Sequence, residues 1–172
     1  MAGEDDTVQR KVANALNQAE RNEFDFHWEL LAREAQIPPL GNWRVWLILA
    51  GRGFGKTRAG AEWVRMIAES HSEARIALVS SSLAEARSVM VEGESGLIAC
   101  SPPDRRPQYD ASLRRRRFPI GAQAHLFSAA EPESLRGPQF SHAWCDEAGK
   151  WPNSHSRATR TWDNLLMGLR LG

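Results

Sequence analysis

The sequence has little cysteine, no long apolar run and almost no net charge, and each shortage excludes a class of protein. Its two cysteines, Cys100 and Cys145, are too few and too isolated for a disulfide framework or a zinc site. The five histidines show no metal-ligand spacing. No apolar run approaches the roughly 18 residues that a membrane span needs, and the acidic start, MAGEDDTVQR, lacks the hydrophobic core of a signal peptide. The composition predicts a soluble cytoplasmic protein without a membrane partner.

The formal net charge of +1 provides no overall field that would attract nucleic acid, so such a partner must be inferred locally. A length of 172 residues with 42% hydrophobic content fits one domain with a small appendage. We expect a helical appendage over residues 1–40 and the main domain over residues 41–172. Helical spacing of apolar residues predicts a first helix within residues 1–20 and a second over residues 26–36, which ends before two prolines.

Three apolar runs predict strands of a parallel sheet. They cover residues 43–50, 75–82 and 140–145, and a helical pattern separates the first two, as in a βαβ unit. The segment 112–129 alternates around a Pro-Ile-Gly turn and predicts an antiparallel hairpin. The last segment, TRTWDNLLMGLRLG, has the spacing of a helix. The predicted fold is therefore a three-layer α/β domain with a mainly parallel sheet and an inserted antiparallel hairpin.

A glycine-rich stretch, WLILAGRGFGKTRAGAEWVR, lies between the first predicted strand and a predicted helix. Helical spacing puts Ala59, Trp63, Met66 and Ile67 on one face of that helix. The phosphate-loop pattern requires Gly, four residues, then Gly-Lys-Thr/Ser, and here Ala50 replaces the first glycine. The loop can still direct backbone N–H groups at an anion if Ala50 keeps a negative φ. We predict that Lys56 reaches the β and γ phosphates of ATP and that Thr57 ligates Mg²⁺. The predicted nucleotide-binding residues of the loop are Gly51, Arg52, Gly53, Phe54, Gly55, Lys56 and Thr57.

Two adjacent carboxylates follow the third predicted strand, in the sequence HAWCDEAGKW. A phosphate loop needs an acidic partner at the end of another buried strand, which holds the metal and prepares a water. We predict that Asp146 holds Mg²⁺ and that Glu147 acts as general base or orients the attacking water. Alone, this pair could equally cap the next segment.

Several successive motifs resemble those of large terminase subunits, the ATP-driven DNA-packaging motors of tailed phages, prophages and gene transfer agents. They are GRGFGKTRAGAEWVR, VEGESGL, LFSAAEPESLRGPQFSHAWCDE and WDNLLMGLRLG. The resemblance extends from about residue 24 to the end. It implies a P-loop NTPase fold of the additional-strand catalytic-glutamate type, with ATP and Mg²⁺ as cofactors. It also implies double-stranded DNA, a portal protein, a small terminase subunit and other copies in a ring as partners.

The resemblance also assigns roles to single residues. The segment AREAQIPP is similar to the adenine-contacting segment of the family, which makes Gln36 a candidate for reading the base. Arg52 matches an arginine that can approach the γ-phosphate. Arg136 resembles an arginine proposed to reach a neighbouring subunit's nucleotide. These two arginines are competing candidates for the same catalytic role, and either could instead form an ordinary ion pair.

Family members continue after GLRLG with a strand that carries a Thr-rich coupling motif, and then with a nuclease domain; the sequence contains neither, so we expect an ATPase domain incomplete at its carboxyl end. Two other functions stay open, a helicase-like or other P-loop NTPase and a nucleotide-binding module without motor activity. The glutamate after Asp146 argues against most kinases, and no helicase arginine motifs follow it. The run of Arg114, Arg115, Arg116 and Arg117 is the densest positive charge, but strand alternation allows at most half of it to face DNA.

Overall fold

The structure is a computed structural model, which describes residues 17–110 and 115–171. The chain divides after Ile37 into two compact units. The first unit contains α2 (Gln18–Asp25), α3 (Trp28–Leu31) and the 3₁₀ turn η1 (Glu34–Gln36). The predicted helix over residues 26–36 is interrupted, because Ala32 and Arg33 adopt extended backbone conformations. The helix predicted within residues 1–20 lies mostly outside the described residues.

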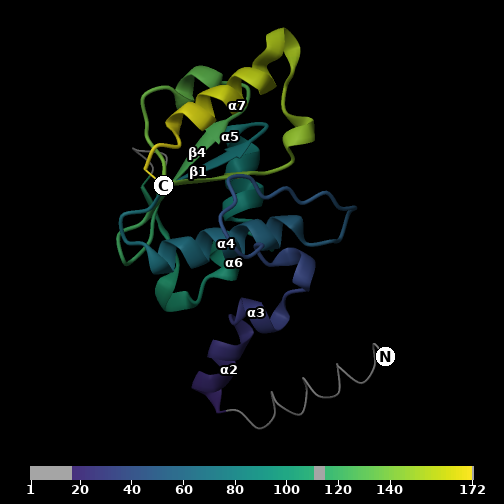
Figure 1. Cartoon of the computed structure of the whole chain (residues 1–172). Coiled ribbons are helices and arrows are strands. Elements are labelled where there is room, and N and C mark those ends of the chain that lie inside the picture. The colour runs from purple at the N-terminus through teal and green to yellow at the C-terminus, as the bar shows by residue number, and fades with distance from the viewer. Residues whose placement is uncertain (1–16, 111–114, 172) are drawn as a thin grey trace. The chain divides into compact units, whose positions relative to one another are not determined.

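The second unit contains a five-stranded sheet in the order β2-β3-β4-β1-β5 (Figure 1). The strands are β1 (Arg75–Ser80), β2 (Gln108–Asp110), β3 (Arg115–Arg117), β4 (Gln123–Ser128) and β5 (His142–Cys145). β1 lies parallel to both β4 and β5, whereas β2, β3 and β4 pair antiparallel. The strands predicted over residues 75–82 and 140–145 are confirmed as β1 and β5, and so is their parallel orientation, because β1 pairs directly with β5.

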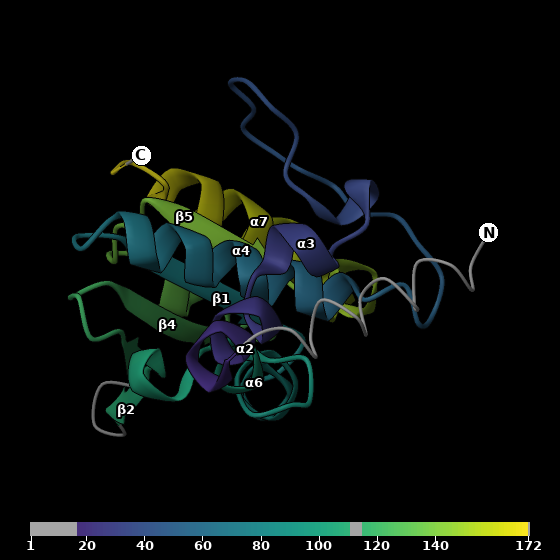
Figure 2. The same ribbon diagram turned by 90° about the horizontal axis from the view of Figure 1, so that it is seen from below.

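Helices cover both faces of this sheet. The α-helices of the second unit are α4 (Lys56–Ser70), α5 (Leu83–Glu85), α6 (Leu97–Cys100) and α7 (Arg157–Gly168). It also contains a π-helix, η2 (Ala86–Val91), and the 3₁₀ turns η3 (Pro103–Arg105), η4 (Pro132–Leu135), η5 (Ala148–Lys150) and η6 (Ser154–Ser156). Ile76 and Leu78 of β1 pack in a cluster with residues of α4, η2 and α6, whereas Ala77 and Val79 pack with residues of η4 and α7. Figures 1 and 2 show α4 and α7 on opposite sides of the sheet, which makes three layers.

The predicted hairpin forms, and it is part of the main sheet. β3 and β4 pair antiparallel across a turn in which Gly121 has φ 117° and the Phe118 N–H donates to the Ala122 carbonyl at 2.8 Å. The second strand of the hairpin, β4, also pairs parallel with β1. The hairpin therefore extends the parallel sheet at one edge.

The strand predicted over residues 43–50 was wrong, because these residues belong to no strand. Val45, Leu47 and Leu49 are 55%, 71% and 85% exposed. A strand requires a neighbour that takes up its backbone N–H and C=O groups, and an apolar composition does not supply one. The start of the segment is instead held by contacts between aromatic rings. The ring centroids of Trp43 and of Trp63 in α4 are 6.1 Å apart.

The helix predicted after the glycine loop is confirmed as α4, but its buried face differs slightly from the prediction. Ala59 and Val64 are fully buried, and Trp63 and Ile67 pack partly buried against the core. Met66, predicted on the same face, is 42% exposed. The final predicted helix is confirmed as α7. Within the described residues, no helix is both long and apolar enough to cross a membrane.

Candidate nucleotide-binding site

The glycine loop precedes α4 directly, in the conformation that its glycines allow. Gly53 and Gly55 have φ values of 76° and 86°, a region that side chains with a Cβ atom rarely enter. Gly55 caps α4, and Lys56 is its first residue. Ala50 does not have a positive φ, as the sequence argument required. The loop and the helix amino terminus thus have the general arrangement of an anion site.

The Lys56 side chain folds back over this loop. Its Nζ donates to the carbonyl oxygen of Ala50 at 2.8 Å and to that of Gly51 at 3.2 Å. Phe54 and Thr57 are half-buried beside it. Arg52 is exposed and has no hydrogen-bond or ion-pair partner among the described residues. The loop is therefore closed by interactions between its own lysine and its own carbonyl groups.

Asp146 follows β5 and is held by its backbone. Its N–H donates to the Val79 carbonyl of β1 at 2.9 Å, and its carbonyl accepts from the Trp151 indole at 3.1 Å. The residue is only 6% exposed. Its carboxylate accepts no hydrogen bond from any residue that the structure describes. A buried carboxylate without a donor is a favourable place for a cation.

Glu147, the next residue, has left-handed backbone angles, φ 46° and ψ 46°. Such a conformation is uncommon for a residue with a side chain and tends to occur at functional sites. The turn η5 holds it, because the Lys150 N–H donates to the Glu147 carbonyl at 2.7 Å. The Glu147 side chain is 41% exposed, and its Oε2 lies 3.6 Å from Lys150 Nζ. The two adjacent carboxylates therefore differ, one buried and one accessible.

The charges around Asp146 connect it to the glycine loop. Burial raises the pKa of Asp146 most strongly, and the negative charges of Glu147 and Glu85 raise it further. The ammonium groups of Lys150 and Lys56 lower this pKa. Because Lys56 belongs to the loop, its effect on Asp146 indicates that the loop and the end of β5 are electrostatic neighbours.

The oxygen atoms at this edge suit a hard divalent cation. Mg²⁺ prefers oxygen ligands, keeps several waters and commonly binds through one or two carboxylates together with substrate phosphates. The buried Asp146 carboxylate and the Thr57 hydroxyl fit that chemistry. Within the described part of the chain, no group of three or more His, Cys, Asp or Glu residues could hold a metal alone. The assignments of Thr57 and Asp146 as metal ligands stay predictions.

Two other predicted residues make contacts of their own. Arg136 donates from Nε to Asn164 Oδ1 at 3.3 Å and pairs through Nη1 with Glu133 at 2.8 Å, with 62% of its side chain exposed. Gln36 is buried in the first unit, where its Oε1 accepts from the Arg33 N–H at 2.9 Å and closes a capping box. The catalytic role of Arg136 and the base-reading role of Gln36 stay predictions.

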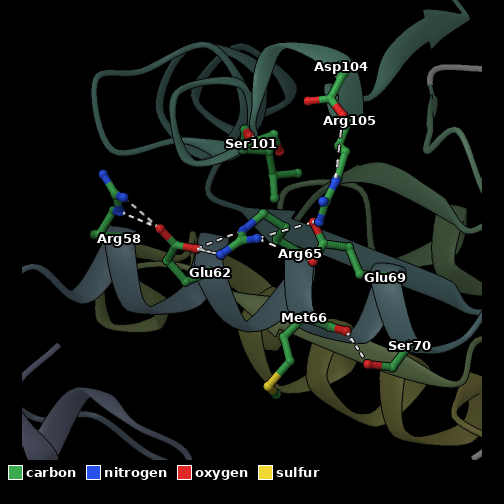
Figure 3. Close-up of polar contacts among 10 residues, drawn as sticks. Arg58, Glu62, Arg65, Met66, Glu69, Ser70, Ser101, Asp104 and Arg105 are labelled. Atoms are coloured by element: carbon green, nitrogen blue, oxygen red, sulfur yellow. Dashed lines mark hydrogen bonds and ion pairs between the residues drawn. The ribbon is translucent and has the colours of Figure 1, made fainter. Parts of the chain in front are cut away.

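An ion-pair network follows α4 away from the loop (Figure 3). Glu62 is buried and bridges Arg58 at 2.6 Å and Arg65 at 2.8 Å. Arg65 also pairs with Glu69 at 3.1 Å. The Glu62 side chain has no exposure to solvent, and its two arginine partners offset the cost of burying its negative charge. The network fixes side chains along the helix that begins at Lys56.

The arginine run is only partly available to DNA. Arg116 is 5% exposed, pairs with Glu92 at 3.1 Å and stacks over the Tyr109 ring at 4.4 Å from its centre. Arg115 donates to Gln123 at 2.8 Å. Arg117 is exposed, and Arg114 lies outside the described residues. Arg116 is thus buried in contacts within the chain and is not accessible to DNA in this structure.

Glu85 lies at the same edge as Asp146 and was not predicted from the sequence as a site residue. It follows β1 in α5, and its carboxylate accepts hydrogen bonds from the hydroxyls of Ser81 and, at 3.5 Å, Ser80. Its position in the sequence could have indicated it, because Glu85 follows the end of a buried parallel strand by five residues and ligand-binding side chains gather at such strand ends.

A family model described as terminase large subunit, T4likevirus-type, N-terminal, matches residues 47–162. The match begins in the segment before the glycine loop, includes Asp146 and Glu147, and ends within α7. No curated protein and no solved structure matches the chain significantly.

Proposed function

The chain belongs to the family of terminase large subunits, as a T4likevirus-type N-terminal region, and we propose that it binds and hydrolyses ATP for a DNA-packaging motor. The family supports a DNA-packaging role. One observation carries the ATPase proposal: Asp146 is buried without a hydrogen-bond donor among the described residues, while the charge of Lys56 from the glycine loop acts on it. A P-loop NTPase fold is the simplest explanation for a glycine-loop lysine and a buried aspartate at the same edge of the sheet.

In this proposal the loop residues bind the phosphates of ATP. Backbone N–H groups of the loop and the amino terminus of α4 favour negative charge. Lys56 exchanges its two carbonyl partners for the β and γ phosphates, which are stronger acceptors because they are charged. Thr57 and Asp146 hold Mg²⁺, which supplies charge neutralisation when bound. Arg52 stabilises the charge that develops on the γ-phosphate in this proposal, which is supported by its exposure and its lack of a partner among the described residues.

Glu147 prepares the water that attacks the γ-phosphate. A bond forms between the water oxygen and the γ-phosphorus, and the bond from that phosphorus to the oxygen bridging to ADP breaks. The water proton passes to the Glu147 carboxylate, while ADP leaves with the bridging oxygen. The exposed side chain of Glu147 suits this role better than the buried Asp146. Lys150 Nζ lies 3.6 Å from Glu147 Oε2 and is the ion-pair partner of this carboxylate.

The family also suggests the partners of such a motor. We propose transient contact with the phosphates of double-stranded DNA, and assembly with a portal protein, a small terminase subunit and further copies in a ring. Exposed Arg117 can contribute to DNA contact. Arg136 would need to exchange Glu133 and Asn164 for a neighbouring subunit's nucleotide. A nucleotide-binding module without motor activity is the alternative.

The test compares ATP binding and turnover of the wild type with those of Glu147→Gln. We expect the variant to retain ATP binding and to lose about 10²-fold in turnover, as removal of a general base commonly does. Glu94→Gln, a change at an exposed glutamate between η2 and α6, is the matched control and should behave as the wild type. Equal turnover in wild type and Glu147→Gln would show that Glu147 is not catalytic. Absence of ATP binding by the wild type would reject the function itself.

A further inference from the structure

The carboxylate of Glu85 lies at the carboxyl end of β1, among serine hydroxyls. Its Oε2 accepts a short hydrogen bond from the Ser81 hydroxyl and lies 3.5 Å from the Ser80 hydroxyl. β1 is the strand between β4 and β5, so this point is central at the edge where the carboxyl ends of the parallel strands meet. Ligands of α/β proteins bind at such edges.

Helix capping does not explain where this carboxylate points. Ser82 and Glu85 have the Ser-x-x-Glu spacing of a capping box, and the Ser82 hydroxyl accepts from the Glu85 N–H at 3.2 Å. A complete box would also return the Glu85 carboxylate to the Ser82 N–H, and no such bond exists among the described residues. The carboxylate turns to the strand end instead, which leaves the cap half-formed.

Backbone contacts bring this strand end to Asp146. The Asp146 N–H donates to the carbonyl of Val79, the residue before Ser80. On the other side, the Ser128 hydroxyl of β4 donates to the Ser81 carbonyl at 3.2 Å. The segment from Val79 to Ser81 is thus fixed between two strands, with the Asp146 backbone bonded at one end and the Glu85 carboxylate bonded to Ser81 at the other. Asp146 itself is buried and without a hydrogen-bond donor in the described structure.

Building on the proposed ATP site, we propose that Glu85 is a positioning residue for the magnesium ion, acting through Ser81 and the water shell of the ion. A serine hydroxyl has one proton, and Ser81 donates it to Glu85. The lone pairs of that oxygen can then only accept, and ion-bound water is a donor. In this proposal Thr57 and Asp146 remain the ligands, and Glu85 acts through Ser81 because its Oε2 already accepts from the Ser81 and Ser80 hydroxyls.

The role of Glu85 is independent of the role of Glu147. Glu147 acts on the attacking water, so its removal lowers turnover at any metal concentration. Glu85 acts on the affinity for the ion, so its removal raises the metal concentration that is needed. Groups that support a metal through an intermediate partner typically contribute 10- to 100-fold to metal affinity. We therefore expect about a tenfold effect from Glu85, because it acts through a hydroxyl and water.

The test measures Mn²⁺ affinity by electron paramagnetic resonance, with Mn²⁺ as the probe and ADP bound to the whole chain. ADP affinity is first measured with a chelator present. Glu85→Gln should bind ADP as the wild type does and bind Mn²⁺ about tenfold more weakly. The matched control is Glu73→Gln, at the opposite end of β1, where Ser72 similarly lies 3.5 Å from the carboxylate; its Mn²⁺ affinity should not change.

A second variant, Ser81→Ala, keeps Glu85 and removes only the hydroxyl. It should also weaken Mn²⁺, by a smaller factor than Glu85→Gln. Mn²⁺ affinities of Glu85→Gln and the wild type within twofold of each other would overturn the proposal. Unchanged affinity in Ser81→Ala would overturn the hydroxyl route. Failure of the wild type to bind ADP is a different result, which rejects the nucleotide site and this inference with it.

Discussion

Gly60 allows α4 to approach β5, and Gly60→Ala tests how closely the loop-bearing helix depends on the acidic strand. A Cβ atom at Gly60 would lie 2.2 Å from Cε2, 2.3 Å from Nε1 and 2.7 Å from Cζ2 of Trp144. Ordinary contacts between such atoms are about 3.5–4.0 Å. The Trp144 side chain is 8% exposed, so its ring cannot turn into solvent. The helix and the strand must therefore move apart.

The expected loss of stability follows from two opposing effects. Overpacking of a core costs about 1–3 kcal/mol. Alanine is a better helix former than glycine by about 1 kcal/mol, which offsets part of that cost. Because the closest approach would be 2.2 Å, the overpacking cost should lie in the upper half of its range, about 2–3 kcal/mol. We therefore expect Gly60→Ala to lower the free energy of unfolding by about 1–2 kcal/mol in urea denaturation. Because Lys56 begins the same helix, ATP affinity should also fall.

A double-mutant cycle identifies the cause. In a Trp144→Phe background the smaller ring removes the clash, so Gly60→Ala should be neutral or stabilising there. The control is Gly149→Ala, since a Cβ at Gly149 meets nothing within 4 Å. If Gly60→Ala lowers stability equally in both backgrounds, the contact with Trp144 is not what fixes α4 on β5.

Three further predictions follow from the buried charges and thiols. Glu62→Gln should destabilise the protein by about 1.5–3 kcal/mol in urea denaturation, because Arg58 loses its buried carboxylate partner and Arg65 keeps only Glu69. A loss below about 1 kcal/mol would contradict this. Asp146→Asn should raise the urea midpoint of unfolding of the ligand-free protein at neutral pH, because the raised pKa of Asp146 means that the fold favours the uncharged carboxyl. The midpoint of the wild type should approach that of the variant as the pH falls through this pKa. A lower midpoint for the variant than for the wild type would refute the prediction. Burial and the charge of Glu62 raise the pKa of Cys100 to about 12, so iodoacetamide at pH 8 should modify it only after unfolding, as mass spectrometry can show; rapid modification of the native protein would disagree.

Local patterns predicted the elements that local chemistry decides. Helix α4 begins where the glycines end, since Gly55 supplies the left-handed cap and a run of good helix formers follows. The hairpin of β3 and β4 was predictable because Gly121 permits a turn that most residues resist. The strands β1 and β5 follow from their β-branched and aromatic residues, which fit a sheet covered on both faces.

Long-range pairing decided what could not be predicted. The apolar run over residues 43–50 resembles β1 in composition, yet only β1 finds strand neighbours on both sides. The burial of Arg116 depends on Glu92 and Tyr109, which approach it only in the folded sheet. The direction of the Glu85 carboxylate likewise depends on a choice between the Ser82 N–H and nearby hydroxyls. Sequence spacing alone does not decide such choices.

The central claim is that the glycine loop binds the phosphates of ATP, and calorimetric titration of ATP in Mg²⁺ into wild type and Lys56→Ala tests it most directly. Hydrogen bonds to charged groups contribute about 1.5–3 kcal/mol, so the variant should lose at least about tenfold in affinity. Arg75→Ala, which removes a cation at the opposite end of β1, should bind as the wild type does. Equal ATP affinity in the wild type and Lys56→Ala would contradict the account.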